Sequence, residues 1–541
     1  MLRGLNMDRP LLLSSALAYA GRTHGATEVV SSDSAGVTRR LTWAEIDQRA
    51  RWAARALGSL GVEDGQRVAT IAWNDHRHLE AYYAAFGSGA CLHTVNPRLF
   101  DDQLAYIVDH ADDTVICFDP DFAEMAQRLR ERSPRVRHWV ALGADDAGVD
   151  GALVWDDLVA ASQGPYEWPE FDERQGAALC YTSGTTGNPK GILYHHRALV
   201  LQAMAVSMGD GHGINSTENA LLAVPMFHVN GWAVPFTAPL TGASLILPGP
   251  DVAPTTLIDW INTEQATWSA GVPTVWLGVV QELERTGQTL ESLRHVSIGG
   301  SSAPLSLVRT LQDTYGVEVS HVWGMTEMTL GSSGTMPRRI AALPRDQRDE
   351  KQMKAGRETW GVDLKIVDLD DNELPRDGEA QGELLARGPW VAGSYYTPQG
   401  REPAPDTHTD DGWLRTGDVA TIDPDGWIQI VDRIKDVIKS GGEWISSIEL
   451  ENAAVGCAGV AEAAVIGLPH PKWQERPLLV VVRDTGSAVT ADQVRAHLEG
   501  EVAKWWLPDE IVFVDDIPHT GTGKIRKTAL RDQFADHQLP G

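Results

Sequence analysis

Cysteine is scarce in this chain of 541 residues. The four cysteines, Cys91, Cys117, Cys180 and Cys457, lie far apart and include no Cys-x-x-Cys spacing. Cys117 and Cys180 stand within apolar runs, which favours buried free thiols over zinc ligands or disulfide partners. Free thiols are typical of a reducing compartment, so we expect a cytoplasmic protein.

Long hydrophobic runs are also missing. No stretch of 18 apolar residues occurs, so the sequence predicts no membrane span. The run Leu11–Ala20 superficially resembles the apolar part of a signal peptide, but it is short and Asp8 interrupts the basic residues before it. We therefore predict a helix of the mature fold at this position.

Basic residues are few beside acidic ones. The chain has 46 Lys and Arg against 74 Asp and Glu, a net charge of −28. This balance argues against nucleic acid or an anionic membrane as a general partner. A polyanionic small molecule would need basic groups gathered locally.

The length predicts more than one domain, and neither internal repeats nor low-complexity tracts appear.

The stretch Tyr181–Gly191 concentrates hydroxyl groups, three glycines and the cation of Lys190. An apolar run over 177–181 predicts a buried strand before it, and the segment from Leu193 to about Met208 predicts a helix after it. Strand, glycine-rich loop and helix in this order can hold phosphates, because glycine lets backbone N–H groups approach closely. The stretch is not a Walker A loop, which needs Gly-Lys-Ser/Thr in sequence. A turn without a ligand is the alternative.

Two further stretches, His321–Glu327 and Gly412–Asp418, add to the first. Together the three resemble the core motifs of the adenylate-forming superfamily, which comprises acyl-CoA synthetases, nonribosomal peptide adenylation domains and firefly luciferase. The resemblance covers nearly the whole chain and keeps the family's motif order. It implies activation of a carboxylic acid by ATP, followed by transfer of the acyl group to CoA.

The order of predicted elements indicates an α/β protein. A capping box at Thr42–Glu45 opens a helix, and strands at 67–72, 91–95 and 115–118 alternate with helices, which predicts parallel sheets. The alternation resumes from Ala177 to about Gly331. From Gly361 the pattern changes to one typical of a small antiparallel barrel or sheet.

We therefore predict a large N-terminal domain, residues 1–432, made of two parallel-type α/β sheets plus a small β-barrel at about 355–431. A smaller α+β domain follows at 433–541, with a helix at 448–455, strands at 461–466 and 478–482, a helix at 491–498 and a strand at 510–514. The resemblance implies that this second domain is mobile, with its hinge at Lys435.

The resemblance also implies a nucleotide site. The loop would hold the β- and γ-phosphates, Trp323 would stack on adenine where the family usually has tyrosine, and Asp418 would accept the ribose hydroxyls. Thr185 and Glu327 occupy positions associated with Mg²⁺. The predicted ATP- or AMP-binding residues are Thr182, Ser183, Gly184, Thr185, Thr186, Lys190, Gly300, Ser301, Ser302, Trp323, Gly324, Met325, Thr326, Asp418 and Arg433.

The stretch Gly521–Lys524 resembles the family's C-terminal catalytic lysine motif, although a lysine after such a turn could also be an exposed loop residue. The ammonium group of Lys524 would bridge the substrate carboxylate and the α-phosphate. The predicted catalytic residues are Lys524, Glu327 and His228.

A third set of residues is predicted to bind CoA. The loop 439–444 resembles the one that lines the pantetheine tunnel, and its members are Lys439, Ser440, Gly441, Gly442, Glu443 and Trp444. Lys472 and Arg476 could meet CoA phosphates or could equally be surface charges.

The stretch Pro225–Trp232 resembles the segment that lines the acyl pocket in the medium- and long-chain branch of the acyl-CoA synthetases. That branch also contains methylmercaptopropionate-CoA ligases, so the motif leaves chain length open. The resemblance implies that Trp232, His228 and Gly300 contact the acyl group. No basic residue in the stretch would pair with a second carboxylate, which favours apolar acids over dicarboxylates.

The sequence thus predicts an ATP-dependent acyl-CoA synthetase for a monocarboxylic, medium- or long-chain fatty acid, with Mg²⁺ as cofactor. The alternatives are a ligase for methylmercaptopropionate or another short acid, a stand-alone enzyme that loads a carrier protein, a luciferase-type oxidase, and a nucleotide-binding regulator without activity. By analogy with this branch, we expect a homodimer.

Overall fold

The computed structural model describes most of the chain, namely residues 2, 4–182, 188–368, 370–398, 400–402, 407–440, 443–519 and 525–539. These residues form two compact units, which we describe separately. The first unit contains the described residues up to 182 with 188–363 and 387–414, and the second contains 364–386 and 415–539. Much of the predicted β-rich segment thus groups with the C-terminal part. The predicted boundary between residues 432 and 433 remains a prediction.

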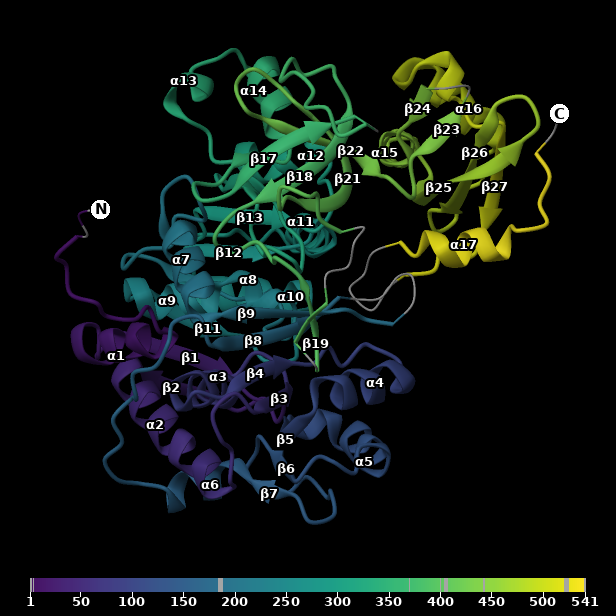
Figure 1. Ribbon diagram of the computed structural model, residues 1–541. Helices are drawn as coiled ribbons and strands as arrows, with labels where there is room; N and C mark the ends of the chain where they lie inside the picture. The colour runs from purple at the N-terminus through teal and green to yellow at the C-terminus, as the bar shows by residue number, and fades with distance from the viewer. Residues whose placement is uncertain are drawn as a thin grey trace. The chain divides into compact units, whose positions relative to one another are not determined.

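The first unit contains a nine-stranded sheet, here called the β3 sheet (Figure 1). Its order is β20 (Gly400–Glu402), β19 (Tyr395–Thr397), β9 (Gly191–His195), β8 (Gly176–Tyr181), β4 (Cys91–Thr94), β3 (Arg67–Ile71), β5 (Asp113–Phe118), β6 (His138–Ala141) and β7 (Leu153–Val154). From β8 to β7 neighbouring strands are parallel, and β9, β19 and β20 are antiparallel additions. Strands such as β5 are fully buried, as expected for parallel strands covered on both faces.

A second nine-stranded sheet of the same unit is called the β13 sheet. Its order is β16 (Arg357–Glu358), β15 (Ser332–Ser333), β14 (Glu318–Trp323), β13 (His295–Gly299), β12 (Trp268–Gly271), β10 (Asn219–Leu221), β11 (Ser244–Leu247), β1 (Glu28–Ser32) and β2 (Thr38–Thr42). The strands from β14 to β1 are parallel. Two strands from the start of the chain therefore extend a sheet that is otherwise built from residues 219–358.

Helices cover both sheets. They are α1 (Leu13–Thr23), α2 (Trp43–Ser59), α3 (His76–Ser88), α4 (Asp101–Ala111), α5 (Ala123–Arg132), α6 (Trp155–Ala161), α7 (His196–Ser207), α8 (Val229–Trp232), α9 (Val234–Thr241), α10 (Pro254–Thr263), α11 (Pro273–Thr286), α12 (Leu305–Arg309), α13 (Arg338–Ala341) and α14 (Arg345–Gln352). The predicted N-terminal helix is confirmed as α1. The predicted capping box opens α2, where Thr42 and Glu45 bond each other's backbone N–H. None of the helices in the described residues is long and apolar enough to cross a membrane.

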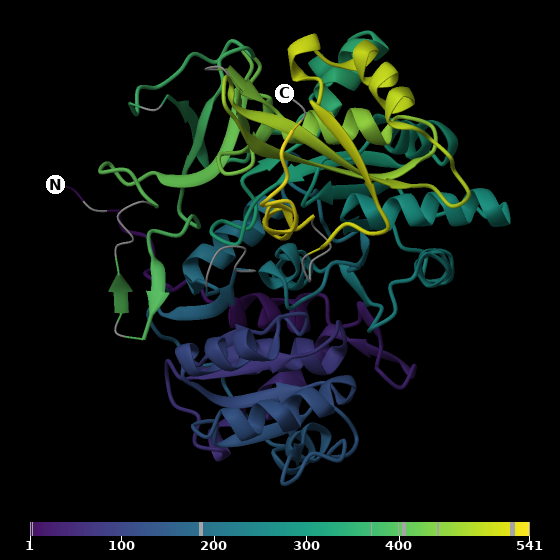
Figure 2. The same ribbon diagram turned by 90° about the vertical axis from the view of Figure 1, so that its right-hand side faces the viewer.

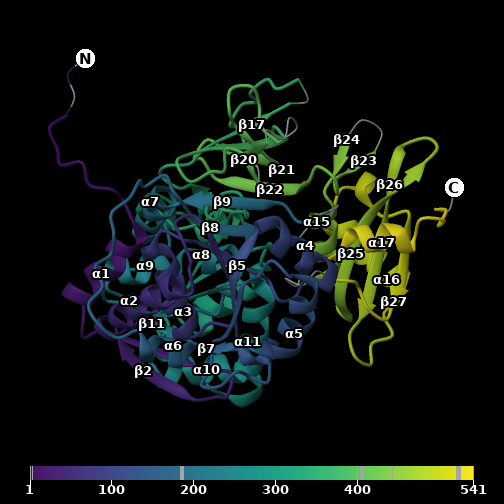
Figure 3. The same ribbon diagram turned by 60° about the horizontal axis from the view of Figure 1, so that its bottom comes forward.

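Helix α3 is buried almost along its whole length and packs on strands of both sheets: β3, β4 and β8 on one side and β1 on the other. Helices α1 and α2 lie beside it, and α6 packs against α2 (Figure 3). The hydroxyl of Tyr82 donates to the carbonyl of Met226, and that of Tyr83 donates to the carbonyl of Pro235 at 2.8 Å. The helix thereby holds the segment that carries the predicted acyl-contacting residues.

The second unit contains two sheets. A four-stranded sheet has the order β17 (Asp363–Val367), β18 (Gly382–Arg387), β21 (Leu414–Ile422) and β22 (Ile428–Arg433), and its last two strands are antiparallel. A five-stranded sheet contains β24 (Glu443–Ile445), β23 (Ile438–Ser440), β26 (Gln474–Arg483), β25 (Val460–His470) and β27 (Glu510–Val514). The long pair β25–β26 is yellow-green in Figure 2.

Helices α15 (Ser447–Val455), α16 (Ala491–Glu501) and α17 (Lys527–Gln533) complete the second unit. Leu450 and Leu498 join an apolar cluster on one face of the five-stranded sheet, and Leu530 joins a cluster on the opposite face. The predicted order of helix, two strands, helix and strand in this part of the chain is confirmed.

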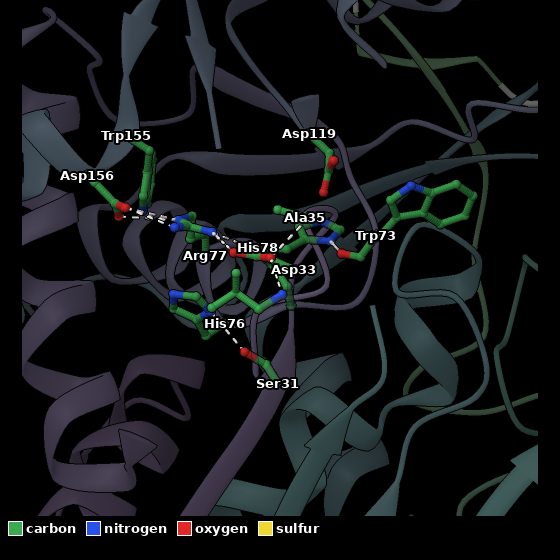
Figure 4. Close-up of polar contacts among 12 residues, drawn as sticks. Ser31, Asp33, Ala35, Trp73, His76, Arg77, His78, Asp119, Trp155 and Asp156 are labelled. Carbon is green, nitrogen blue, oxygen red and sulfur yellow. Dashed lines mark hydrogen bonds and ion pairs between the residues drawn. The ribbon is translucent and has the colours of Figure 1, made fainter. Parts of the chain in front are cut away.

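A buried polar network surrounds the first turn of α3 (Figure 4). The guanidinium of Arg77 lies 2.9 Å from Asp156, 3.4 Å from Asp33 and 3.7 Å from Asp75. His76 bonds Ser31 of β1 at 2.9 Å, and burial lowers the pKa of the His76 imidazole to about 3. The network therefore contains a neutral histidine and the guanidinium of Arg77 placed among three carboxyl groups.

Asp75 caps α3, where its side chain accepts the N–H of His78 at 2.8 Å. The residue is 2% exposed, and burial raises the pKa of its carboxyl group to about 8. The ordinary value of 3.8 applies once the chain unfolds. Between about pH 4 and pH 8 the folded chain therefore holds a proton on Asp75 that the unfolded chain has already released. The free energy of unfolding consequently falls as the pH rises through this window.

Asp75→Asn should remove this dependence, because an amide oxygen can still accept the His78 N–H but does not titrate. We expect the melting temperature of the variant, minus that of the parent chain, to rise by a few °C from pH 5 to pH 8 and to level off above pH 8. Differential scanning calorimetry in buffers from pH 5 to pH 9 measures it. A difference that stays constant across the series would contradict the proton assigned to Asp75.

Candidate active site

The carboxyl ends of β13 and β14 bring two predicted motifs to one edge of the β13 sheet. The strands are parallel, and Gly299 lies opposite Val322. Gly300–Ser302 and Gly324–Glu327 therefore follow neighbouring strands at the edge where ligands bind in open α/β sheets. Gly324 cannot be replaced without a shift in the backbone, since a Cβ there would lie 1.7 Å from the carbonyl oxygen of Thr329.

Glu327 is a buried carboxylate at this edge, with 6% of its surface exposed. It accepts a hydrogen bond of 2.7 Å from the hydroxyl of Tyr395 on β19. Burial, followed by the charge of Glu327, raises the pKa of the Tyr395 phenol far above its usual range, so the phenol remains a donor. The ammonium of Lys190 lies 4.8 Å from the centre of the Tyr395 ring. The structure thus brings together Glu327 and Lys190 through Tyr395.

The predicted phosphate loop is the connection of a β-hairpin. Strand β9 returns antiparallel to β8, with Tyr181 opposite Gly191, and only then does α7 begin. The helix predicted to start at Leu193 therefore starts at His196. The expected strand–loop–helix order is wrong because residues 191–195 pair with β8 instead of turning into a helix.

Lys190 and Thr182 close this hairpin connection. The N–H of Thr182 donates to the carbonyl of Lys190 at 3.0 Å, and the N–H of Lys190 donates to the hydroxyl of Thr182 at 3.1 Å. The intervening predicted residues Ser183, Gly184, Thr185 and Thr186 lie outside the described residues. A second tie comes from β9, because the Tyr194 hydroxyl donates to the carbonyl of Thr326.

The segment with the predicted acyl-contacting residues is held by Asn74, which is 3% exposed. The side-chain amide of Asn74 donates to the carbonyls of Leu222 and Val224, each at 2.8 Å, and its oxygen accepts the N–H of Met226 at 2.7 Å. Each of these buried bonds contributes about 1 kcal/mol, and leaving one of the groups without a partner costs about 1–3 kcal/mol. One side chain therefore fixes the path of the chain into the segment.

Beyond Met226 the backbone makes a left-handed turn. Five consecutive residues, 229–233, have φ between 38° and 63°. This conformation costs an L-residue about 1–2 kcal/mol, and a β-branched residue such as Val229 rarely adopts it. Asn230 is anchored there, since its side-chain oxygen accepts from the thiol of Cys180 at 3.2 Å. Strain of this kind persists where the surrounding structure imposes it, often at functional sites.

The turn aims Trp232 at the β13 sheet. A Cβ placed on Gly299 would lie 3.1 Å from the far edge of the Trp232 ring. His228 precedes the turn, and its N–H donates to the carbonyl of Pro225 at 3.1 Å. The ring of Trp323 lies against Gly331, where a Cβ would approach it to 2.5 Å. Of the predicted acyl residues, Trp232 is thus brought beside the strand that ends at Gly299, next to Gly300.

In the second unit, Asp418 and Arg433 face each other across the pair β21–β22. The guanidinium of Arg433 lies 2.6 Å from the carboxylate of Asp418, which is 2% exposed. The structure therefore brings together two residues of the predicted nucleotide site, Asp418 and Arg433.

The predicted hinge follows directly after Arg433. The side chain of Arg531 on α17 donates to the carbonyl of Lys435 at 3.1 Å and pairs with Asp436 at 2.7 Å. Asp432 accepts the N–H and the hydroxyl of Ser447 at 2.6 and 2.5 Å. The backbone around Lys435 is thus tied to α15 and α17, and a hinge role stays a prediction.

The predicted CoA loop forms the hairpin β23–β24, in which Lys439 pairs with Trp444 and Ser440 with Glu443. Gly441, Gly442 and Lys524 lie outside the described residues. The side chain of Arg476 makes structural hydrogen bonds within the second unit, to Asp509, Ser440 and the carbonyls of Trp505 and Leu507. The ammonium of Lys472 lies 4.4 Å from the ring of Trp473.

Three functional candidates were missed from the sequence: Tyr395, Asn74 and Asn230. Each acts on a partner at least 50 residues away in the chain, at Glu327, at 222–226 and at Cys180. No local pattern marks such contacts, since they arise only when distant strands pair.

Comparison with known proteins identifies the family. Residues 18–396 match the family model described as AMP-binding enzyme, and residues 449–524 match that of the AMP-binding enzyme C-terminal domain. The 3-methylmercaptopropionyl-CoA ligase of Ruegeria lacuscaerulensis is 45% identical over 98% of this chain and 99% of its own. The medium-chain-fatty-acid–CoA ligase of Ectopseudomonas oleovorans is 42% identical over 98% of each chain.

Two further likenesses support the same family. The long-chain-fatty-acid–CoA ligase of Thermus thermophilus is 43% identical over 98% of this chain and 97% of its own. A crystal structure of ATP-bound MatB from Rhodopseudomonas palustris superposes with a TM-score of 0.83 at 26% identity, covering 97% of this chain and 99% of that one. The predicted fold class is confirmed by these likenesses. The chain therefore belongs to the family of AMP-binding enzymes and is an acyl-CoA ligase of the adenylate-forming superfamily.

Proposed function

We propose that this enzyme uses ATP to activate a monocarboxylic acid with an uncharged chain, forming acyl-AMP and pyrophosphate and then acyl-CoA and AMP. One observation supports the proposal. The Glu327–Tyr395 pair lies at the carboxyl edge of β13 and β14, and Trp232 packs against Gly299 at the same edge. A buried carboxylate and an apolar wall at one edge suit a polar reaction centre with an apolar acyl group next to it.

Glu327 fits the role of a Mg²⁺ ligand. Its carboxylate is buried and has a hydroxyl donor that fixes its orientation. Among the described residues, no group of three or more His, Cys, Asp or Glu side chains could hold a metal ion. Mg²⁺ commonly binds through one or two carboxylates together with substrate phosphates, and it would offset the charge of the triphosphate. We propose Glu327 for this ion, with Thr185 as the second protein ligand.

The remaining roles follow the family resemblance. We propose that the hairpin connection from Thr182 to Lys190 holds the phosphates, and that Trp323 stacks on adenine. Asp418, oriented by Arg433, would accept the ribose hydroxyls. Lys524 would neutralise charge on the α-phosphate in the adenylation step.

The acyl group is proposed to lie against Trp232 and Gly299, with its carboxylate toward His228 and Gly300. The stretch 225–232 contains no lysine or arginine, so it offers no partner for a second carboxylate. The relatives act on 3-methylmercaptopropionate, medium-chain and long-chain fatty acids, which share an uncharged chain.

We also propose a cytoplasmic homodimer. All four cysteines are free and buried, as suits a reducing compartment. Light scattering coupled to size-exclusion chromatography tests the dimer, and a monomeric mass at micromolar concentration would refute it.

The reaction is tested by acid-dependent release of pyrophosphate from ATP and Mg²⁺, with and without free CoA. The acids run from propionate, butyrate and 3-methylmercaptopropionate through octanoate to palmitate. We expect AMP and acyl-CoA in equal amounts, with turnover dependent on CoA. Pyrophosphate release without any thioester on free CoA would favour the alternative enzyme that loads a carrier protein.

Lys524→Ala should block adenylation and spare the second step. We expect a loss of about 100-fold or more in acyl-AMP formation, because a charge that contacts the transition state is removed. Thioester formation from supplied acyl-AMP should stay within a few-fold of the parent enzyme. Equal losses in both half-reactions would show that Lys524 has no special role in adenylation.

Glu327→Gln removes the negative charge of this side chain and keeps its size and its hydrogen bond from Tyr395. Glutamine can still accept the Tyr395 hydrogen bond, so the melting temperature should change little. Adenylation should nevertheless fall about 100-fold or more, since a neutral amide is a poor ligand for Mg²⁺.

Tyr395→Phe is the matched control, because it removes the hydrogen bond and keeps both the carboxylate and the ring below Lys190. We expect a loss of about tenfold or less. A Glu327→Gln enzyme with nearly full adenylation activity would remove this carboxylate from the reaction centre.

A further inference from the structure

One face of the β13 sheet leads from the proposed acyl position toward the opposite end of the strands. Side chains alternate along a strand, so His295, Ser297 and Gly299 of β13 share a face. The neighbouring strands place Ala270 of β12 and Ser320 of β14 beside Ser297. The opposite face is filled by Val296, Ile298 and other residues of an apolar core. The row on the first face is therefore made of small or polar side chains.

The two ends of this row differ. At the carboxyl end, Trp232 lies against Gly299, where we place the acyl group. At the amino end is a pocket of about 870 Å³, lined by Trp268, His295, Ser320 and His212 and also by charged side chains such as Glu218 and Arg294. Only one residue of the row on β13, Ser297, separates the two ends, a span of about 13 Å from Gly299 to His295.

His212 stands between the two ends. It follows α7, and its N–H is bonded to the carbonyl of Val206 at 2.9 Å. Its ring bonds the hydroxyl of Ser297 at 2.8 Å and packs edge-on against Trp268, with ring centres 5.4 Å apart. Ser297 also lies 3.4 Å from the Nε2 atom of His295. The side chains of His212, Ser297 and His295 therefore form a chain of buried polar contacts, and Ser297 is the next residue after Gly299 on this face of β13.

We propose that His212, bonded to Ser297, closes the acyl channel behind Gly299 and thereby restricts the enzyme to short acids. The inference rests on the proposed acyl-CoA ligase reaction and specifies its substrate class: acids of about the size of butyrate or 3-methylmercaptopropionate. A longer chain would have to displace the imidazole from Ser297 and Trp268. That displacement would leave buried polar groups without partners while an apolar chain passes them.

The imidazole of His212 is uncharged, since burial lowers its pKa to about 3. The residue is 4% exposed, so it forms part of the wall of the pocket and not a surface group. The closure is therefore a matter of shape and hydrogen bonding, and removing the ring would open the row toward the pocket at its amino end, which His212 lines.

The test compares kcat/KM for butyrate, 3-methylmercaptopropionate, octanoate and decanoate in the parent enzyme and in His212→Ala. The parent enzyme should prefer the two short acids. His212→Ala should raise the ratio of octanoate to butyrate at least tenfold, since each methylene that a pocket admits or excludes is worth about 10- to 200-fold. His212→Phe, which keeps a ring in place, should retain the preference for short acids.

His196→Ala is the matched control. His196, the first residue of α7, is a buried histidine like His212, but its ring lies against Phe86 and Phe171 and does not line the pocket. The control therefore opens a hole of the same size elsewhere, and its ratio of octanoate to butyrate should equal that of the parent enzyme. A rise as large as that of His212→Ala would overturn the assignment.

Binding supplies a second measurement that needs no variant. Acyl-sulfamoyl adenosines with four-carbon and ten-carbon chains mimic the acyl-AMP, and calorimetry should show the shorter one binding the parent enzyme at least tenfold more tightly. Equal affinities for the two analogues, or an unchanged preference among acids in an active His212→Ala enzyme, would refute the role of His212 and leave the proposed function standing. Absence of CoA-dependent turnover with every acid would instead overturn the proposed function.

Discussion

The side-chain amide of Asn74 is the contact on which the candidate site depends. Asn74 lies between β3 and α3, and its three hydrogen bonds hold residues 222–226, which leave β10 of the other sheet. The backbone groups that it satisfies belong to buried residues, so losing these bonds would leave them without partners. Because one amide joins elements of both nine-stranded sheets, the left-handed turn that follows Met226 starts from a defined point. Trp232 and Gly299 therefore meet in a fixed geometry.

The local elements were largely predictable because local rules produce them. The capping box at Thr42–Glu45 and the alternation of strands and helices both follow from patterns within a few residues. In the second unit the predicted strand at 510–514 agrees with β27 to the residue. The misplaced start of α7 shows the limit, since residues 191–195 form a strand only because β8 lies beside them.

The site was predictable in its motifs and not in its contacts. The sequence places Glu327 and Asp418 within recognisable stretches, but it gives no sign of Tyr395, which comes 68 residues after its partner. It also gives no sign of the left-handed turn, because Val229 and Trp232 are residues that local propensity would never assign to positive φ. Tertiary packing imposes both features, and they coincide with the place where the chemistry is proposed.

The left-handed turn also limits how this enzyme can evolve. Most side chains are strained at five successive positions with positive φ, so few substitutions within residues 229–233 preserve the backbone. Gly299 and Ser297 on β13 are in ordinary strand conformation, but Gly299 is limited in size, because a Cβ there would lie 2.7 Å from the side chain of Val322 and 3.1 Å from Trp232. Changes in acid preference should therefore be easier to obtain at sheet positions such as Ser297 than at Gly299 or within the turn.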